Sequence, residues 1–148
     1  MSLEVTLIYT ILLIVFLLIL TIRVLDLRGS PVTKFLHPPD RVVNPETLER
    51  AIRAHGNLIE YAPLFLLLLL LAEINQLNEV ILHLSGASFF LGRLMHGIGF
   101  GFLRHSPIMR IGGMALTFLG FIILLLTSAS QLLSCLLYTS PSPRDSRR

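Results

Sequence analysis

The sequence predicts an all-α membrane protein, built as a bundle of four transmembrane helices. Hydrophobic residues make up 53% of the 148 residues and charged residues only 14%, whereas soluble domains carry about 25% charged residues. Four apolar stretches along the chain reach the roughly 20 residues that a helix needs to cross a bilayer. Short polar segments separate them, so the chain has no room for a separate soluble catalytic domain.

The first predicted span covers about residues 3–25. Its beginning is acidic, at Glu4, and its apolar run has full transmembrane length. A cleavable signal peptide has a positive beginning and a shorter apolar segment, so we expect this helix to be retained. Residues 26–44 then form a loop, because Gly29-Ser30-Pro31 and His37-Pro38-Pro39-Asp40 interrupt any continuous helix.

The second predicted span covers about residues 48–74. Asn44-Pro45-Glu46 precedes it and is typical of a helix beginning, because asparagine caps, proline tolerates the first position and glutamate favours the positive end of the helix dipole. The third span covers about residues 80–103 and the fourth about residues 109–133. Arg104-His105-Ser106-Pro107 separates these two spans.

The segment 134–148 is polar and rich in proline and serine after its first few residues, and we expect it to be disordered. It also resembles adaptor or vector read-through, so we leave it out of the functional reasoning. A single four-helix membrane domain is therefore predicted over residues 1–133.

Composition also bears on metal and nucleic-acid binding. The chain has a single cysteine, Cys135, which rules out an internal disulfide and offers no metal-ligand set. We therefore expect no metal site. The basic residues are scattered between apolar segments, and no basic tract has the interleaved aromatic residues of a nucleic-acid-binding surface. We expect no nucleic-acid partner either.

Lysine and arginine residues predict the orientation of the chain in the membrane. Nine of them lie on the side of the long loop, and the turn between the second and third spans has none. The nine are Arg23, Arg28, Lys34, Arg41, Arg50, Arg53, Arg93, Arg104 and Arg110. Because cytoplasmic loops carry an excess of basic residues, we expect the long loop in the cytoplasm and both termini outside.

Polar residues inside the apolar helices are the candidates for function, since charged groups at bilayer depth are costly unless paired or facing a cavity. In the second span, Arg53, Asn57 and Glu60 fall within an arc of about 60° on one helix face. In the third span, four residues form a similar stripe, and antiparallel packing brings both stripes together with Arg110. The four are Arg93, His96, Phe100 and Arg104. Five potential cations then face one carboxylate, and this imbalance favours a small, multiply charged anionic ligand.

Structural roles are the alternatives for the same residues. Arg53 and Arg104 could extend towards lipid head groups, and Glu60 could join helices by pairing with Arg53, Arg93 or His96. His96 taken alone is more typical of a packing histidine than of a ligand or an acid. Six of the glycines in the third and fourth spans indicate close helix packing. They are Gly97, Gly99, Gly101, Gly112, Gly113 and Gly120.

From Glu49 to Phe65 the chain reads ERAIRAHGNLIEYAPLF. This segment is similar to the second-helix signature of the MAPEG superfamily, the membrane-associated proteins of eicosanoid and glutathione metabolism, and is the specific match. GRLMHGIGF, from Gly92 to Phe100, and SPIMRIGGMALT, from Ser106 to Thr117, resemble its third-helix end and fourth-helix beginning. The resemblance implies a homotrimer of four-helix subunits, with glutathione bound between neighbouring subunits near the cytoplasmic face.

The resemblance also implies roles for individual residues. Arg53, Asn57, Glu60 and Tyr61 match glutathione-binding positions of the second helix, with Glu60 near the amino group of the tripeptide. Two residues match polar positions of the third helix, and one resembles the catalytic arginine that faces the glutathione sulfur. The first two are Arg93 and His96, and the last is Arg110.

The implied activity is glutathione-dependent transfer or peroxide reduction, with a hydrophobic electrophile reaching the site from the membrane lipids. Phe100 stands where characterised synthases often have tyrosine, and Gly56 occupies a position that is basic in some relatives. These departures make the chain similar to the bacterial branch, which places it in a bacterial inner membrane. They leave open a non-catalytic lipid-binding or scaffold protein of the same fold. A proton or ion pathway through Glu60 and His96 is a third interpretation.

Overall fold

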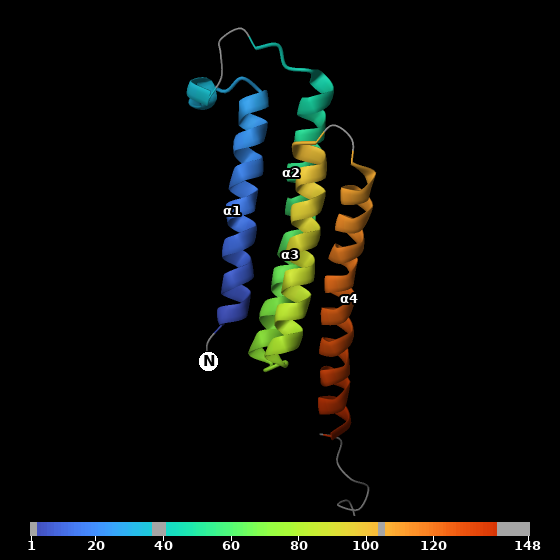
Figure 1. Ribbon diagram of the computed structural model, residues 1–148. Helices are drawn as coiled ribbons and strands as arrows, with labels where there is room; N and C mark the ends of the chain where they lie inside the picture. Colours follow the sequence, from blue (N-terminus) through green and yellow to red (C-terminus); the bar gives the residue numbers. More distant parts are fainter. Residues whose placement is uncertain (1–2, 37–40, 104–105, 139–148) are drawn as a thin grey trace, which may run out of the picture.

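A computed structural model describes residues 3–36, 41–103 and 106–138 of the chain. In these residues the chain forms four long helices and one short 3₁₀ helix (Figure 1). They are α1 (Glu4–Leu27), η1 (Pro31–Leu36), α2 (Pro45–Ile74), α3 (Glu79–Gly101) and α4 (Pro107–Tyr138). No strand occurs in the described ranges. The all-α, four-helix prediction is therefore confirmed.

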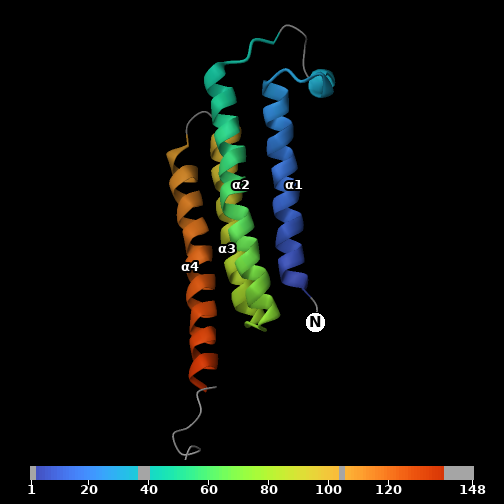
Figure 2. The ribbon, with the colours of Figure 1, turned by 180° about the vertical axis from the view of Figure 1, so that it is seen from behind.

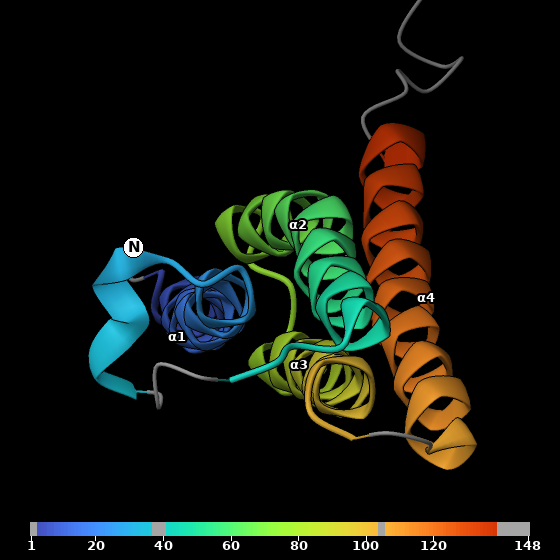
Figure 3. The same cartoon turned by 90° about the horizontal axis from the view of Figure 1, so that it is seen from above.

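Successive helices run antiparallel, so α1 begins and α4 ends at the same end of the bundle (Figure 1). The long α1–α2 connection and the α3–α4 turn lie at the opposite end. Seen along the helices, α2 and α3 lie between α1 and α4 (Figure 3), and the view from behind agrees (Figure 2). The most extensive contact joins α3 to α4, while α1 packs on both α2 and α3.

Three helices, α1, α2 and α4, are long and apolar enough to cross a membrane. The third predicted span, α3, has 23 residues and runs along the same length of the bundle (Figure 1). Its composition is more polar because it contains glycines, serines and buried Arg93 and His96. These residues lie against the other helices and not on an apolar outer face, as a central helix of a bundle requires.

The fourth helix extends beyond the span predicted from the sequence. It ends at Tyr138, so the expectation of disorder was wrong for Ser134–Tyr138. Leucine is a strong helix former, and leucines 132, 133, 136 and 137 continue the helix with no proline before Pro141. The rest of the predicted disordered tail, residues 139–148, lies outside the described residues.

Aromatic side chains fill the centre of the bundle, and glycines let α3 and α4 approach closely. The rings of Phe65 and Phe89 stack with centroids 3.9 Å apart, and Phe121 packs edge-on against both. A Cβ atom at Gly92 would lie 2.6 Å from the backbone nitrogen of Thr117 and 2.7 Å from the carbonyl oxygen of Gly113. The α3–α4 contact is thus backbone against backbone, as small residues permit between membrane helices.

Polar groups hold the helix ends at both ends of the bundle. At the end of the bundle where α1 begins, the Glu73 carboxylate accepts hydrogen bonds from the backbone N–H groups of Val5 (2.9 Å) and Thr6 (2.8 Å). A carboxylate from α2 therefore satisfies free donors in the first turn of α1, where negative charge is favoured by the helix dipole. Asn44 caps α2 through the N–H of Glu46, as its sequence predicts.

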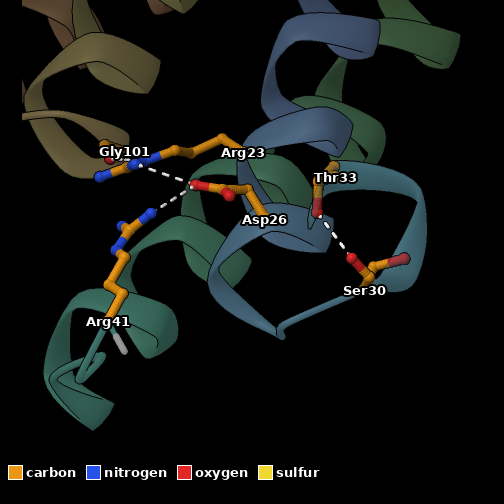
Figure 4. A network of polar contacts seen from close by, with 6 residues as sticks. All are labelled: Arg23, Asp26, Ser30, Thr33, Arg41 and Gly101. Carbon is orange, nitrogen blue, oxygen red and sulfur yellow. Dashed lines mark hydrogen bonds and ion pairs between the residues drawn. The ribbon is translucent and has the colours of Figure 1, made fainter. Parts of the chain in front are cut away.

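At the opposite end, arginines bind the carbonyl groups at the end of α3. The Arg50 guanidinium donates to Gly99 (3.1 Å) and Leu103 (2.6 Å), and Arg23 donates to Gly101 (3.5 Å). Arg23 and Arg41 both contact the buried Asp26 carboxylate, at 3.5 and 3.1 Å (Figure 4). These contacts tie the α1–α2 connection to the end of α3, and positive charge there complements the negative end of its dipole. The predicted site residues lie next to these contacts, towards the middle of the bundle.

Candidate functional site

Arg93 of α3 is the most deeply buried charged residue of the predicted set, with 2% of its side chain exposed. Its Nε and Nη2 atoms donate to the Thr117 hydroxyl of α4, at 2.9 and 2.7 Å. Its Nη1 atom donates to the Asn57 side-chain oxygen of α2. The Thr117 hydroxyl in turn donates to the carbonyl oxygen of Gly113, at 2.7 Å. Three helices thus fix the plane of one guanidinium group.

Aromatic rings complete the surroundings of this guanidinium group. Tyr61 of α2 lies with its ring centroid 4.9 Å from the Arg93 guanidinium carbon, and Phe89 of α3 lies at 6.0 Å. Tyr61 also packs edge-on against Phe118 and Phe121 of α4. Cation–π contact offsets part of the cost of removing the guanidinium from water.

All these partners are neutral. In the part of the chain that the structure describes, no carboxylate lies within ion-pair distance of Arg93. A buried charge without an opposite charge is costly, since dipoles and rings compensate only part of the lost hydration. The arrangement therefore holds an uncompensated positive charge inside the bundle, and an anionic ligand close to it would be stabilised.

A second cationic group surrounds Phe100, two turns further along α3. The Arg110 guanidinium carbon lies 5.0 Å from the centroid of the Phe100 ring, and that of Arg50 lies at 5.9 Å. The buried His96 ring packs on Phe100 with centroids 4.8 Å apart. Arg110, Arg50 and Phe100 line a cleft of about 320 Å³ at the end of the bundle. Glu46, Ser106 and Pro107 complete its lining.

The predicted site residues therefore fall into three sets. Asn57, Tyr61 and Arg93 meet directly, and His96 and Arg110 meet through Phe100. Arg53 does not join them. Its side chain is 66% exposed and pairs with Glu49 on the same helix.

Glu60 lies on the outer face of α2 and is exposed. Among the described residues no ion pair joins it to Arg53, Arg93 or His96, so the interhelical pairing considered for it is not present within one chain. Arg104, the remaining predicted cation, lies outside the described residues.

Two residues of the site were not predicted. Thr117 is the main hydrogen-bond partner of Arg93, and Arg50 lines the cleft beside Arg110. A signal for Thr117 exists in the sequence, because this hydroxyl lies seven residues after Arg110, two helical turns along the same face of an apolar helix. The sequence contains no such signal for Arg50, because its position near the beginning of a helix is typical of a solvated basic residue.

The fold and this site define a multi-helix membrane protein with a cationic centre between its helices. The model of the MAPEG family matches residues 6–130, and the chain belongs to this family. Inner membrane protein YecN of Escherichia coli, in strains K12 and O6:H1, is 35% identical to the chain over 83 residues. That match covers 55% of this chain and 60% of each relative's length. The predicted family resemblance is thus confirmed.

Proposed function

We propose that this protein is a glutathione-dependent membrane transferase or peroxidase that acts on a hydrophobic electrophile. The observation that supports it best is the buried Arg93 guanidinium, held by neutral partners, with further cations of α2 and α4 grouped around Phe100 two turns along the same helix. Glutathione carries two carboxylates, one ammonium group and one thiol. Its net negative charge suits the cationic centre, and it supplies the thiol chemistry that a chain with one exposed cysteine lacks.

Each proposed role follows from the position of the side chain. Arg93 and Asn57 would bind the carboxylate end of the tripeptide, with Tyr61 and His96 forming the walls. Arg110 is exposed at the cleft and would face the sulfur. Arginine stays protonated at neutral pH, so its role is electrostatic and not that of a base.

Stabilisation of the thiolate by Arg110 would activate glutathione for attack. A free thiol has a pKa of about 8.5, and a guanidinium that lowers it by about two contributes roughly 2.7 kcal/mol of preference for the anion, once bound ligand and a neighbouring subunit shield the exposed Arg110 from water. The proton leaves to water. In transfer, the sulfur lone pair forms a bond to an electrophilic carbon of a substrate arriving from the membrane lipids, and the leaving group departs with its bonding electrons or, in a conjugate addition, the displaced π electrons take a proton from water. In peroxide reduction, the sulfur bonds to the outer oxygen as the O–O bond breaks, the alcohol leaves after taking a proton from water, and a second glutathione thiol then displaces water to give the disulfide. No protein nucleophile is required.

A homotrimer would complete the site. Glu60 lies halfway along α2 on an exposed face that continues through Leu64 and Leu67. A carboxylate at that depth facing lipid tails would cost several kcal/mol. A neighbouring subunit that covers this face removes the cost and places Glu60 and Arg53 where they can contact a ligand between the subunits, such as the ammonium group of glutathione.

We further propose that the α1–α2 connection faces the cytoplasm and that both ends of the chain lie outside. α1 begins and α4 ends at one end of the bundle (Figure 1), and the basic residues concentrate at the other, which the positive-inside rule places in the cytoplasm. A reporter active only in the cytoplasm and fused after α4 is expected to be inactive in bacterial cells. An active reporter there would reverse the orientation.

The sharpest test of the enzymatic proposal is Arg110→Ala. The thiolate fraction of bound glutathione at neutral pH, measured by its ultraviolet absorbance, is expected to fall about 25-fold as the thiol pKa returns towards about 8.5. Conjugation of a hydrophobic electrophile is expected to fall with it, while glutathione binding is largely kept. Arg110→Lys, which retains the charge, is expected to keep part of both. Absence of thiolate in the unmodified protein would refute the enzyme and favour a lipid-binding or scaffold protein of the same fold.

A further inference from the structure

The short helix η1 lies beside α1, near the end of the bundle that holds the α1–α2 connection (Figure 3). Arg28 ends α1, and Gly29 turns the chain with a φ of +72°, a conformation that glycine adopts without strain. η1 (Pro31–Leu36) then runs roughly perpendicular to the long helices and outside them, seen end-on in Figure 1 and lengthwise in Figure 3. A helix in this position lies parallel to the membrane plane.

One side chain of η1 is buried, and two apolar side chains are exposed. Thr33 is buried, and its hydroxyl donates to the carbonyl oxygen of Ser30 at 3.0 Å (Figure 4). Val32 and Phe35, three positions apart, are 70% and 82% exposed. Residues three apart share a side of a 3₁₀ helix, so these two form one small apolar surface.

The depth of η1 follows from the length of α1. This helix of 24 residues spans about 36 Å at 1.5 Å per residue, slightly more than a hydrocarbon core of about 30 Å. Its end therefore lies at the boundary between acyl chains and head groups, and η1 follows within four residues. Exposed phenylalanine is favoured at this boundary, where its ring can enter the acyl region.

The charge of the segment selects the kind of lipid. Between Arg28 and Leu36 the chain has two basic residues, Arg28 and Lys34, and no acidic one. Both basic side chains are exposed. Basic residues beside an inserted apolar surface favour phospholipids with a net negative charge.

We propose that η1 is an interfacial anchor that inserts Val32 and Phe35 among acyl chains and gathers anionic phospholipid through Arg28 and Lys34. The rival occupant is a second copy of this chain, which would cover Phe35 with protein. Anionic lipid is favoured because the exposed surface carries charge of one sign. A two-fold contact of η1 with η1 of a second copy would place that charge against itself, and a contact with a different face of a second copy is the outcome that the test below separates from lipid insertion.

The test uses the absence of tryptophan from the chain, which makes Phe35→Trp a single fluorophore. The variant is reconstituted in phosphatidylcholine vesicles that contain phosphatidylglycerol, and either lipid carries brominated acyl chains at the same mole fraction. We expect blue-shifted emission, quenched more strongly when the phosphatidylglycerol is brominated. Because each basic residue near an anionic surface contributes about a five-fold preference, Lys34→Glu in the same variant is expected to remove most of the difference.

Val80→Trp is the matched control, because Val80 is 73% exposed at the other end of the bundle and follows Glu79. Its quenching is expected to show no preference for brominated phosphatidylglycerol. Blue-shifted emission of the Phe35→Trp variant without quenching by either lipid would mean that protein covers η1 and would overturn the proposal. Red-shifted, unquenched emission, equal quenching by both lipids, or an equal preference at Val80→Trp would overturn it as well.

Discussion

Replacement of Gly92 by alanine is expected to lower the free energy of unfolding by about 3 kcal/mol, the upper part of the usual range for overpacking. The added Cβ atom would lie 2.6 Å from the backbone nitrogen of Thr117 and 2.7 Å from the carbonyl oxygen of Gly113. Backbone cannot turn aside as a flexible side chain does, so α3 and α4 must separate. Because Arg93 follows directly and bonds to Thr117, its hydrogen bonds are expected to lengthen in the same variant.

Gly56→Ala is the matched control for Gly92→Ala. Gly56 lies inside α2, and an added Cβ atom there meets nothing within 4 Å. The same substitution should therefore act only through helix propensity and raise the free energy of unfolding by about 1 kcal/mol. Thermal unfolding in detergent, followed by circular dichroism, measures both changes. A Gly92→Ala variant as stable as the unmodified protein would contradict the close α3–α4 contact.

Replacement of Arg93 by methionine is expected to weaken glutathione binding about 100-fold while leaving the protein at least as stable. Loss of one partner from a buried, hydrogen-bonded charge pair costs about 2–5 kcal/mol in binding. In the free protein the same charge has only neutral partners, so its removal relieves a desolvation cost that is expected to match or exceed the hydrogen bonds lost to Asn57 and Thr117. Weakened binding without loss of stability distinguishes a ligand-binding residue from a structural one.

Lys34→Met is the control for Arg93→Met, because it also removes one positive charge but from an exposed residue of η1. Its glutathione affinity, measured by calorimetry on the purified protein, is expected to be unchanged. A strongly destabilised Arg93→Met variant whose folded fraction binds glutathione normally would assign Arg93 to the structure of the bundle alone.

The sequence by itself determined the helices and much of the site. Hydropathy and helix length are local properties, so the spans could be located without knowledge of their neighbours. Helical spacing placed Asn57 on a polar face of α2, and the same rule applied to Arg93 and His96 of α3. The leucines after residue 131 favour a helix, which the prediction of a disordered tail did not take into account, and α4 continues through them to Tyr138.

Only the tertiary structure decided which polar groups meet. Glu73 lies near the end of the second predicted span, and the structure shows that it caps α1 from a position 68 residues away from Val5. Helical spacing places Arg53 on the same face of α2 as Asn57, but the Arg53 side chain pairs with Glu49. Arg93 donates its hydrogen bonds to Thr117, which the sequence analysis did not select. The physical reason is that spacing sets which residues share a side of one helix, whereas the rotation and lateral contacts of each helix depend on packing between residues distant in the chain.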